Sequence, residues 1–94
     1  MITCSLNGSE QRERLGEWTS LLAHAAFRED VAGGLRFVFR PAADFEERVR
    51  RLAAAEHDCC SFLRFDVAQV GDAVVLTVET EPAGQEALRF LFAP

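Results

Sequence analysis

Hydrophobic residues recur along the chain with two different periods. Where every second residue is apolar, the pattern predicts β-strands, and where apolar residues return every three or four positions, it predicts helices. The alternating segments are 2–6, 35–40, 62–67 and 74–79. The segments with helical spacing are 10–26 and 42–57, and a short final helix is expected after Pro82. The predicted order is therefore β-α-β-α-β-β-α.

Turn residues separate these elements and support their boundaries. Gly33-Gly34 marks a loop after the first helix, and Gly71-Asp72 predicts a hairpin between the last two strands. Pro41 ends the second strand and opens the second helix, whose apolar face holds Phe45, Val49, Leu52 and Ala53. We expect a single α+β domain over residues 1–94, with a four-stranded mixed or antiparallel sheet and helices packed on one face.

Composition and charge argue against nucleic-acid binding and against a membrane span. The 94 residues carry a formal net charge of −5, which argues against nucleic acid as a partner, because binding phosphates requires an excess of basic side chains. No apolar run approaches the roughly 20 residues of a membrane span. The opening Met1–Cys4 does not resemble a signal peptide, so we expect a cytoplasmic protein without a membrane partner. Because a domain this small buries only about two-thirds of its surface, a homodimer would add stability.

Chemically informative residues gather at the end of the second helix, in Glu56-His57-Asp58-Cys59-Cys60. Helical spacing places Glu56 on the same stripe as Val49 and Leu52, so this carboxylate is expected to be partly buried. Burial of a carboxylate is unfavourable unless the group is paired, protonated or bound to a cation.

The adjacent cysteines Cys59 and Cys60 are poorly suited to a disulfide with each other, since the small ring would strain the peptide bond between them. They suit a soft cation, or a disulfide with another partner. Cys4 is the third thiol, and three thiolates favour Cu(I), Zn(II) or a heavier ion such as Hg(II). We therefore expect Cys59, Cys60 and Cys4 as metal ligands, with Glu56 and His57 as auxiliary ligands. A soft metal ion is the one cofactor that these residues favour.

Purely structural roles compete with this interpretation. Free cysteines are often buried and simply pack, and a histidine at a helix end often only complements the negative pole of the helix. Zinc-ribbon pairs, a C-x-x-C redox motif, HExxH and a Ser-His-Asp arrangement are absent from the sequence, and no catalytic residue can be named from it.

The run from Glu56 to Phe65 reads E-x-x-C-C-x-F-L-x-F. It resembles the signature E-x-x-C-C-x-F-[LF]-x-F of a family of small bacterial proteins, which often lie near heavy-metal-responsive regulators. The opening Thr3–Leu6 and Trp18 are similar as well, so the resemblance extends over most of the chain. It implies that Glu56, Cys59 and Cys60 are the residues of functional interest, and it implies no particular activity.

Three functions remain open at this point. The first is a soft-metal-binding accessory, sensor or scavenger protein that uses the cysteine pair. The second is a thiol-based redox enzyme, in which one cysteine attacks a small thiol-reactive ligand, the other resolves the product, and Glu56 transfers the proton. The third is a non-catalytic dimerisation domain with cysteines in its core, for which the apolar segment 89–92 offers a surface.

Overall fold

The computed structural model describes residues 8–92 and shows an α+β fold, as predicted. Helix α1 is followed by a β-hairpin, helix α2, a second hairpin, a short 3-10 turn and helix α3. The elements are α1 (Gly8–Leu22), β1 (Ala25–Val31), β2 (Gly34–Phe39), α2 (Phe45–Cys59), β3 (Arg64–Val70), β4 (Ala73–Glu79), η1 (Pro82–Gly84) and α3 (Gln85–Phe92). Within the described range, no helix is long and apolar enough to cross a membrane.

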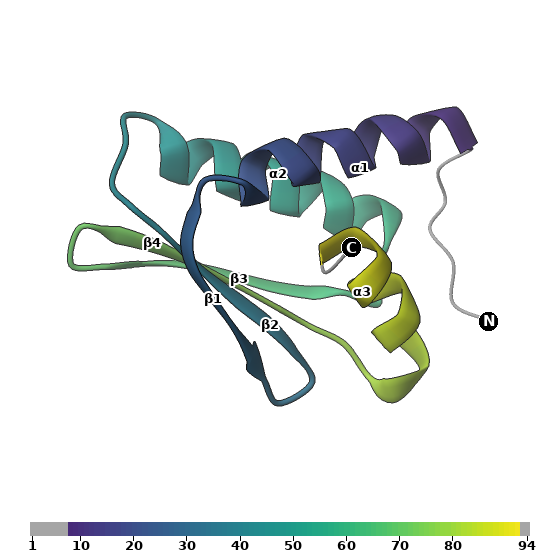
Figure 1. The fold of residues 1–94 in the computed structure, drawn as a ribbon. Helices are drawn as coiled ribbons and strands as arrows, with labels where there is room; N and C mark the ends of the chain where they lie inside the picture. The colour runs from purple at the N-terminus through teal and green to yellow at the C-terminus, as the bar shows by residue number, and fades with distance from the viewer. Residues whose placement is uncertain (1–7, 93–94) are drawn as a thin grey trace.

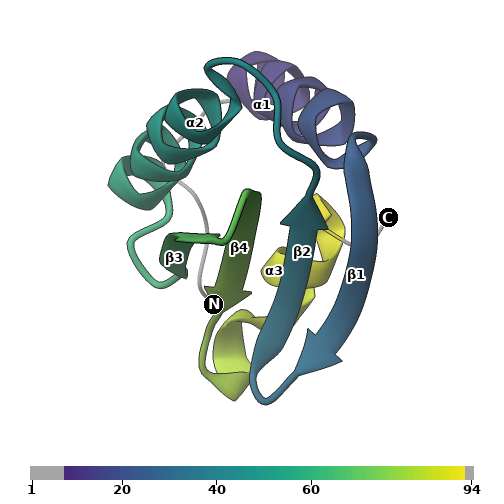
Figure 2. The same ribbon diagram turned by 90° about the vertical axis from the view of Figure 1, so that its left-hand side faces the viewer.

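The four strands form one antiparallel sheet in the order β1-β2-β4-β3. The two hairpins therefore meet through β2 and β4, which lie at the centre. Helices α1 and α2 lie side by side over one face of this sheet (Figures 1 and 2). Helix α3 packs on the same side, since Phe92 contacts the rings of Trp18 and Phe37.

The core lies between the sheet and the helices. Alternate residues of β2 and β4 point into it and are buried, while Arg36 and Thr77 between them are only half-buried on the opposite face. The buried strand residues are Leu35, Phe37, Phe39, Val74, Leu76 and Val78. Along α2, the predicted apolar face is confirmed for Phe45, Val49 and Ala53, which are buried. Burying these side chains provides the main stabilisation of the fold.

Gly34 permits the close approach of the two central strands. A Cβ atom built at this position would lie 1.8 Å from the carbonyl oxygen of Val78, which is backbone and cannot move aside cheaply. The preceding Gly33 has a φ of +79° in the turn between β1 and β2, where a side chain would be strained. Gly33 thus permits the tight turn, and Gly34 permits the close contact between β2 and β4 that follows it.

Two parts of the predicted order differ from the structure. Segment 25–31, which the hydrophobic spacing assigned to the end of a helix and a loop, is the edge strand β1. Its inward-facing residue opposite Phe37 is Arg28, whose guanidinium lies 5.6 Å from the ring centroid. A charged side chain covers the core there, so the strand lacks the apolar alternation that reveals strands elsewhere. The predicted strand 2–6 lies outside the described residues.

Boundaries of the remaining elements shift by a few residues. The first helix ends at Leu22 instead of near residue 26, and the second begins at Phe45 instead of residue 42, after Asp44 in a left-handed conformation. Helix α2 also continues to Cys59, two residues beyond its predicted end. This last extension matters for function, because it places the cysteine pair at the final turn of α2.

Candidate functional site at the end of helix α2

The last turn of α2 carries Glu56, His57 and Cys59, and Cys60 follows directly as the C-cap. The backbone N–H of Cys60 donates to the Glu56 carbonyl at 2.7 Å, and the Cys60 carbonyl accepts from the N–H of Leu63 at 3.0 Å. These bonds close the helix and start the turn that leads into β3. The cysteine pair is therefore fixed at the junction of a helix and a strand.

Glu56 is completely buried, with 0% of its surface exposed. The indole N–H of Trp18 donates to its Oε1 at 2.6 Å, and Nη1 of Arg14 lies 3.4 Å from the same oxygen. Both partners belong to α1, one turn apart. The carboxylate thus joins α1 to α2 inside the protein, and the donors make its burial tolerable.

The helical spacing predicted a partly buried carboxylate at position 56 but did not predict its partners. The missing signal was the spacing of Arg14 and Trp18 on α1, which are four residues apart and so share one face of that helix. Trp18 has two roles in the structure. Its ring does pack in the core, parallel to Phe65 at 5.9 Å and edge-on to Phe92 at 4.7 Å, while its N–H serves Glu56.

The two adjacent cysteines differ in both burial and chemical state. Cys60 is completely buried and disulfide-bonded. Cys59 is half-buried and its thiol is free. The third predicted thiol, Cys4, lies outside the described residues. Although the two cysteines are adjacent in the chain, Cys60 has an enclosed, oxidised sulfur and Cys59 has a partly exposed, reduced one.

His57 is exposed and points to the other side of α2. Its Nδ1 lies 2.9 Å from the carbonyl oxygen of Leu63, which can only accept, so Nδ1 carries the hydrogen and donates. In the neutral ring, Nε2 is then left as an acceptor. Because His57 and Cys59 are two residues apart on a helix, their side chains leave the axis about 200° apart.

The side chains of the predicted metal ligands thus point in different directions. Glu56 points inward to α1, His57 bonds to the chain at the start of β3, and Cys60 is engaged in a disulfide. Among residues 8–92, no three His, Cys, Asp or Glu side chains are grouped as a metal ion would need. A site made of Cys59, Cys60 and Cys4 would include a residue outside this range, so it stays a prediction.

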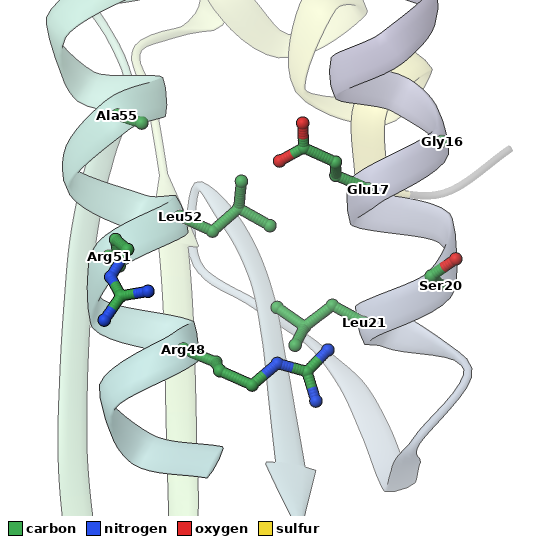
Figure 3. A pocket seen from close by; sticks show the side chains of 8 residues that line it. All are labelled: Gly16, Glu17, Ser20, Leu21, Arg48, Arg51, Leu52 and Ala55. Atoms are coloured by element: carbon green, nitrogen blue, oxygen red, sulfur yellow. The ribbon is translucent and has the colours of Figure 1, made fainter. Parts of the chain in front are cut away.

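A groove of about 590 Å³ runs between α1 and α2 on the outside of the molecule. Figure 3 shows Leu21 and Leu52 facing each other across it, with Arg48 reaching in near one end and Glu17 near the other. Ser20 and Ala55 also line its walls. Neither the groove nor its charged residues was predicted from the sequence.

Comparison with known proteins assigns no family to the chain: no family model, curated protein or solved structure matches it. The resemblance of segment 56–65 to a bacterial signature therefore stays a prediction.

Proposed function

We propose that this protein is a thiol-based redox protein in which Cys59 and Cys60 take part in thiol–disulfide exchange. One observation supports this most directly: Cys60 is disulfide-bonded while its neighbour Cys59 keeps a free thiol. A disulfide next to a free thiol is the arrangement that exchange requires, because the thiolate is the nucleophile and the disulfide is the electrophile.

Burial divides the roles between the two sulfurs. Cys59 packs against the edge of the core and keeps part of its surface open to solvent, whereas Cys60 is enclosed. Access and thiolate character decide which sulfur in a protein reacts first. Cys59 is therefore the sulfur that meets external partners, and Cys60 holds the stored disulfide.

An internal exchange step follows from this division. The Cys59 thiolate attacks the sulfur bonded to Cys60, a new disulfide forms between Cys59 and that sulfur, and the old S–S bond breaks. Cys60 leaves with the electron pair and takes up the proton that Cys59 has lost. The step needs no external oxidant, because one disulfide replaces another.

Soft-metal binding is the competing function, and the surroundings of Glu56 favour it less. That carboxylate accepts from Trp18 and is paired with Arg14, so using it as a ligand would leave both donors without their partner in the core. A thiolate site would also require Cys60 to be reduced first. Metal binding by the fully reduced protein is therefore the alternative that an experiment has to separate from redox exchange.

Dimerisation through an apolar surface is the third function. Among residues 8–92, the large apolar side chains that stand more than half exposed are Phe27, Val70 and Phe90, and they lie on three different elements. Light scattering at micromolar concentration tests this prediction independently of the cysteines.

Redox titration combined with native mass spectrometry tests the proposed function. The protein is equilibrated in buffers of reduced and oxidised glutathione, its disulfides are mapped, and Zn(II), Cu(I) and Hg(II) are added in separate arms. We expect a Cys60 disulfide that forms reversibly, is lost in Cys60→Ser, and moves between positions 59 and 60 only when both cysteines are present. A Cys60 that stays reduced in every buffer, with a metal adduct lost in both Cys→Ser variants, would instead show soft-metal binding.

A further inference from the structure

Two unpaired charges of opposite sign face the groove between α1 and α2. Glu17 on α1 and Arg48 on α2 both line it, and neither forms an ion pair with the other described residues. Between them, Leu21 and Leu52 provide an apolar floor. The groove thus offers a negative group, an apolar middle and a positive group (Figure 3).

Arg51 adds a second cation on the same helix. Its ion pair with Glu47 is exposed, with side chains 74% and 67% accessible, so a competing anion could replace that carboxylate at little cost. The guanidinium of Arg48 lies over the ring of Phe45, 5.6 Å from its centroid, which leaves its N–H donors available.

The groove leads along α2 toward the free thiol. Arg48, Leu52 and Ala55 line it, and Cys59 is the next residue on the same stripe of the helix, four positions after Ala55. At 1.5 Å per residue, Cys59 stands about 6 Å beyond Ala55 and about 12 Å beyond Arg51 along the axis. A ligand a few residues long can therefore touch the arginines and reach the thiol.

We propose that this groove binds a low-molecular-weight zwitterionic peptide disulfide and presents its sulfurs to Cys59. The ligand's carboxylates would pair with Arg48 and Arg51, its ammonium group with Glu17, and its body would lie on Leu21 and Leu52. A volume of about 590 Å³ lies within the usual range of roughly 300–1,000 Å³ for small-molecule sites. This inference rests on the proposed redox function and names its substrate class.

The reaction is a single exchange with a balanced outcome. The Cys59 thiolate attacks one sulfur of the ligand disulfide, a mixed disulfide forms between Cys59 and that half, and the ligand S–S bond breaks. The other half leaves as a thiolate and takes up the proton released by Cys59. The ligand disulfide supplies the oxidising equivalent, so no further oxidant is needed.

Rates of Cys59 modification by two disulfides test the proposal. Oxidised glutathione carries carboxylate and ammonium groups, while hydroxyethyl disulfide is neutral and serves as the reference reagent; intact-mass spectrometry follows both. We expect Arg48→Gln to slow the glutathione reaction about fivefold, as loss of roughly 1 kcal/mol from an exposed ion pair implies. Glu17→Gln should slow it less. Neither variant should alter the rate with hydroxyethyl disulfide.

Arg50→Gln is the matched control, because Arg50 lies on the same helix and pairs with Glu46 away from the groove. Equal rates for Arg48→Gln and Arg50→Gln with oxidised glutathione would overturn the substrate assignment while leaving the redox function intact. If neither reagent modifies Cys59, the redox function fails, and S-methylglutathione then tests the groove without chemistry. NMR shifts of Leu21 and Leu52 on adding that analogue would support the ligand class, and unchanged spectra would reject it.

Discussion

The charged residues on the inner side of α2 are treated differently from those that line the groove between α1 and α2. On the inner side, the carboxylate of Glu56 is fully buried and is met by Trp18 and Arg14. On the groove side, Glu17 and Arg48 are exposed and make no ion pair within the described chain. A buried charge needs partners for the fold to be stable, whereas an exposed one is satisfied by water and stays available to a ligand.

The cysteines follow the same division. Cys60 belongs to the inner side, enclosed and oxidised, and Cys59 to the accessible side, half-buried and free. The inner residues should therefore control stability, and the groove residues should control reactivity. Four substitutions test this separation.

Removing the buried carboxylate should have the largest effect on stability. Glu56→Ala would leave the guanidinium of Arg14 and the indole N–H of Trp18 without their acceptor, so we expect the free energy of unfolding to fall by about 3–5 kcal/mol. Urea denaturation measures it. Glu46→Ala is the control, because its pair with Arg50 is exposed and should be worth less than about 1 kcal/mol. Similar losses in both variants would show that Glu56 does not anchor α1.

Cys60→Ala should have the second-largest effect on the free energy of unfolding, and this effect should depend on redox conditions. In oxidising buffer, loss of the disulfide should lower the free energy of unfolding by about 2–4 kcal/mol, because the unfolded chain gains freedom. In reductant the wild type loses the same bond, so the difference should shrink to about 1 kcal/mol for the missing buried sulfur. Denaturation curves that differ equally in both buffers would argue against a stabilising disulfide at Cys60.

Trp18→Phe should lower the free energy of unfolding by a smaller amount. The phenyl ring keeps part of the contacts with Phe65 and Phe92 but cannot donate to Glu56, and a hydrogen bond to a charged group contributes about 1.5–3 kcal/mol. Combining this substitution with Glu56→Ala should cost less than the sum of the two, since both remove one interaction. Additive losses in that double-mutant cycle would contradict a direct Trp18–Glu56 bond.

Cys59→Ala should have the smallest effect on stability, below about 1 kcal/mol in both oxidising and reducing buffer, because its thiol is free and half-buried. The same variant should abolish modification by small disulfides. A redox-dependent loss of stability in Cys59→Ala would place a stabilising disulfide at position 59.

Much of the fold could be predicted from the sequence because β2, β4 and α2 bury apolar residues at regular spacing. Strand β1 could not, since it lies at the sheet edge and places Arg28, with its guanidinium over the ring of Phe37, where an apolar residue would be expected. At the site, helical spacing predicted that Glu56 faces the core. It could not predict the hydrogen bond from Trp18, because that residue is 38 positions away in the chain. The groove depends on how α1 packs on α2, which no local pattern encodes.

Differential alkylation distinguishes a free thiol from a disulfide at each of the two cysteines. The protein is unfolded in denaturant and treated with one alkylating reagent under non-reducing conditions, then reduced and treated with a second reagent of different mass, and its peptides are analysed by mass spectrometry. We expect Cys59 to carry the first label and Cys60 the second. Equal labelling of both cysteines by the first reagent would contradict it, because Cys60 would then hold no disulfide.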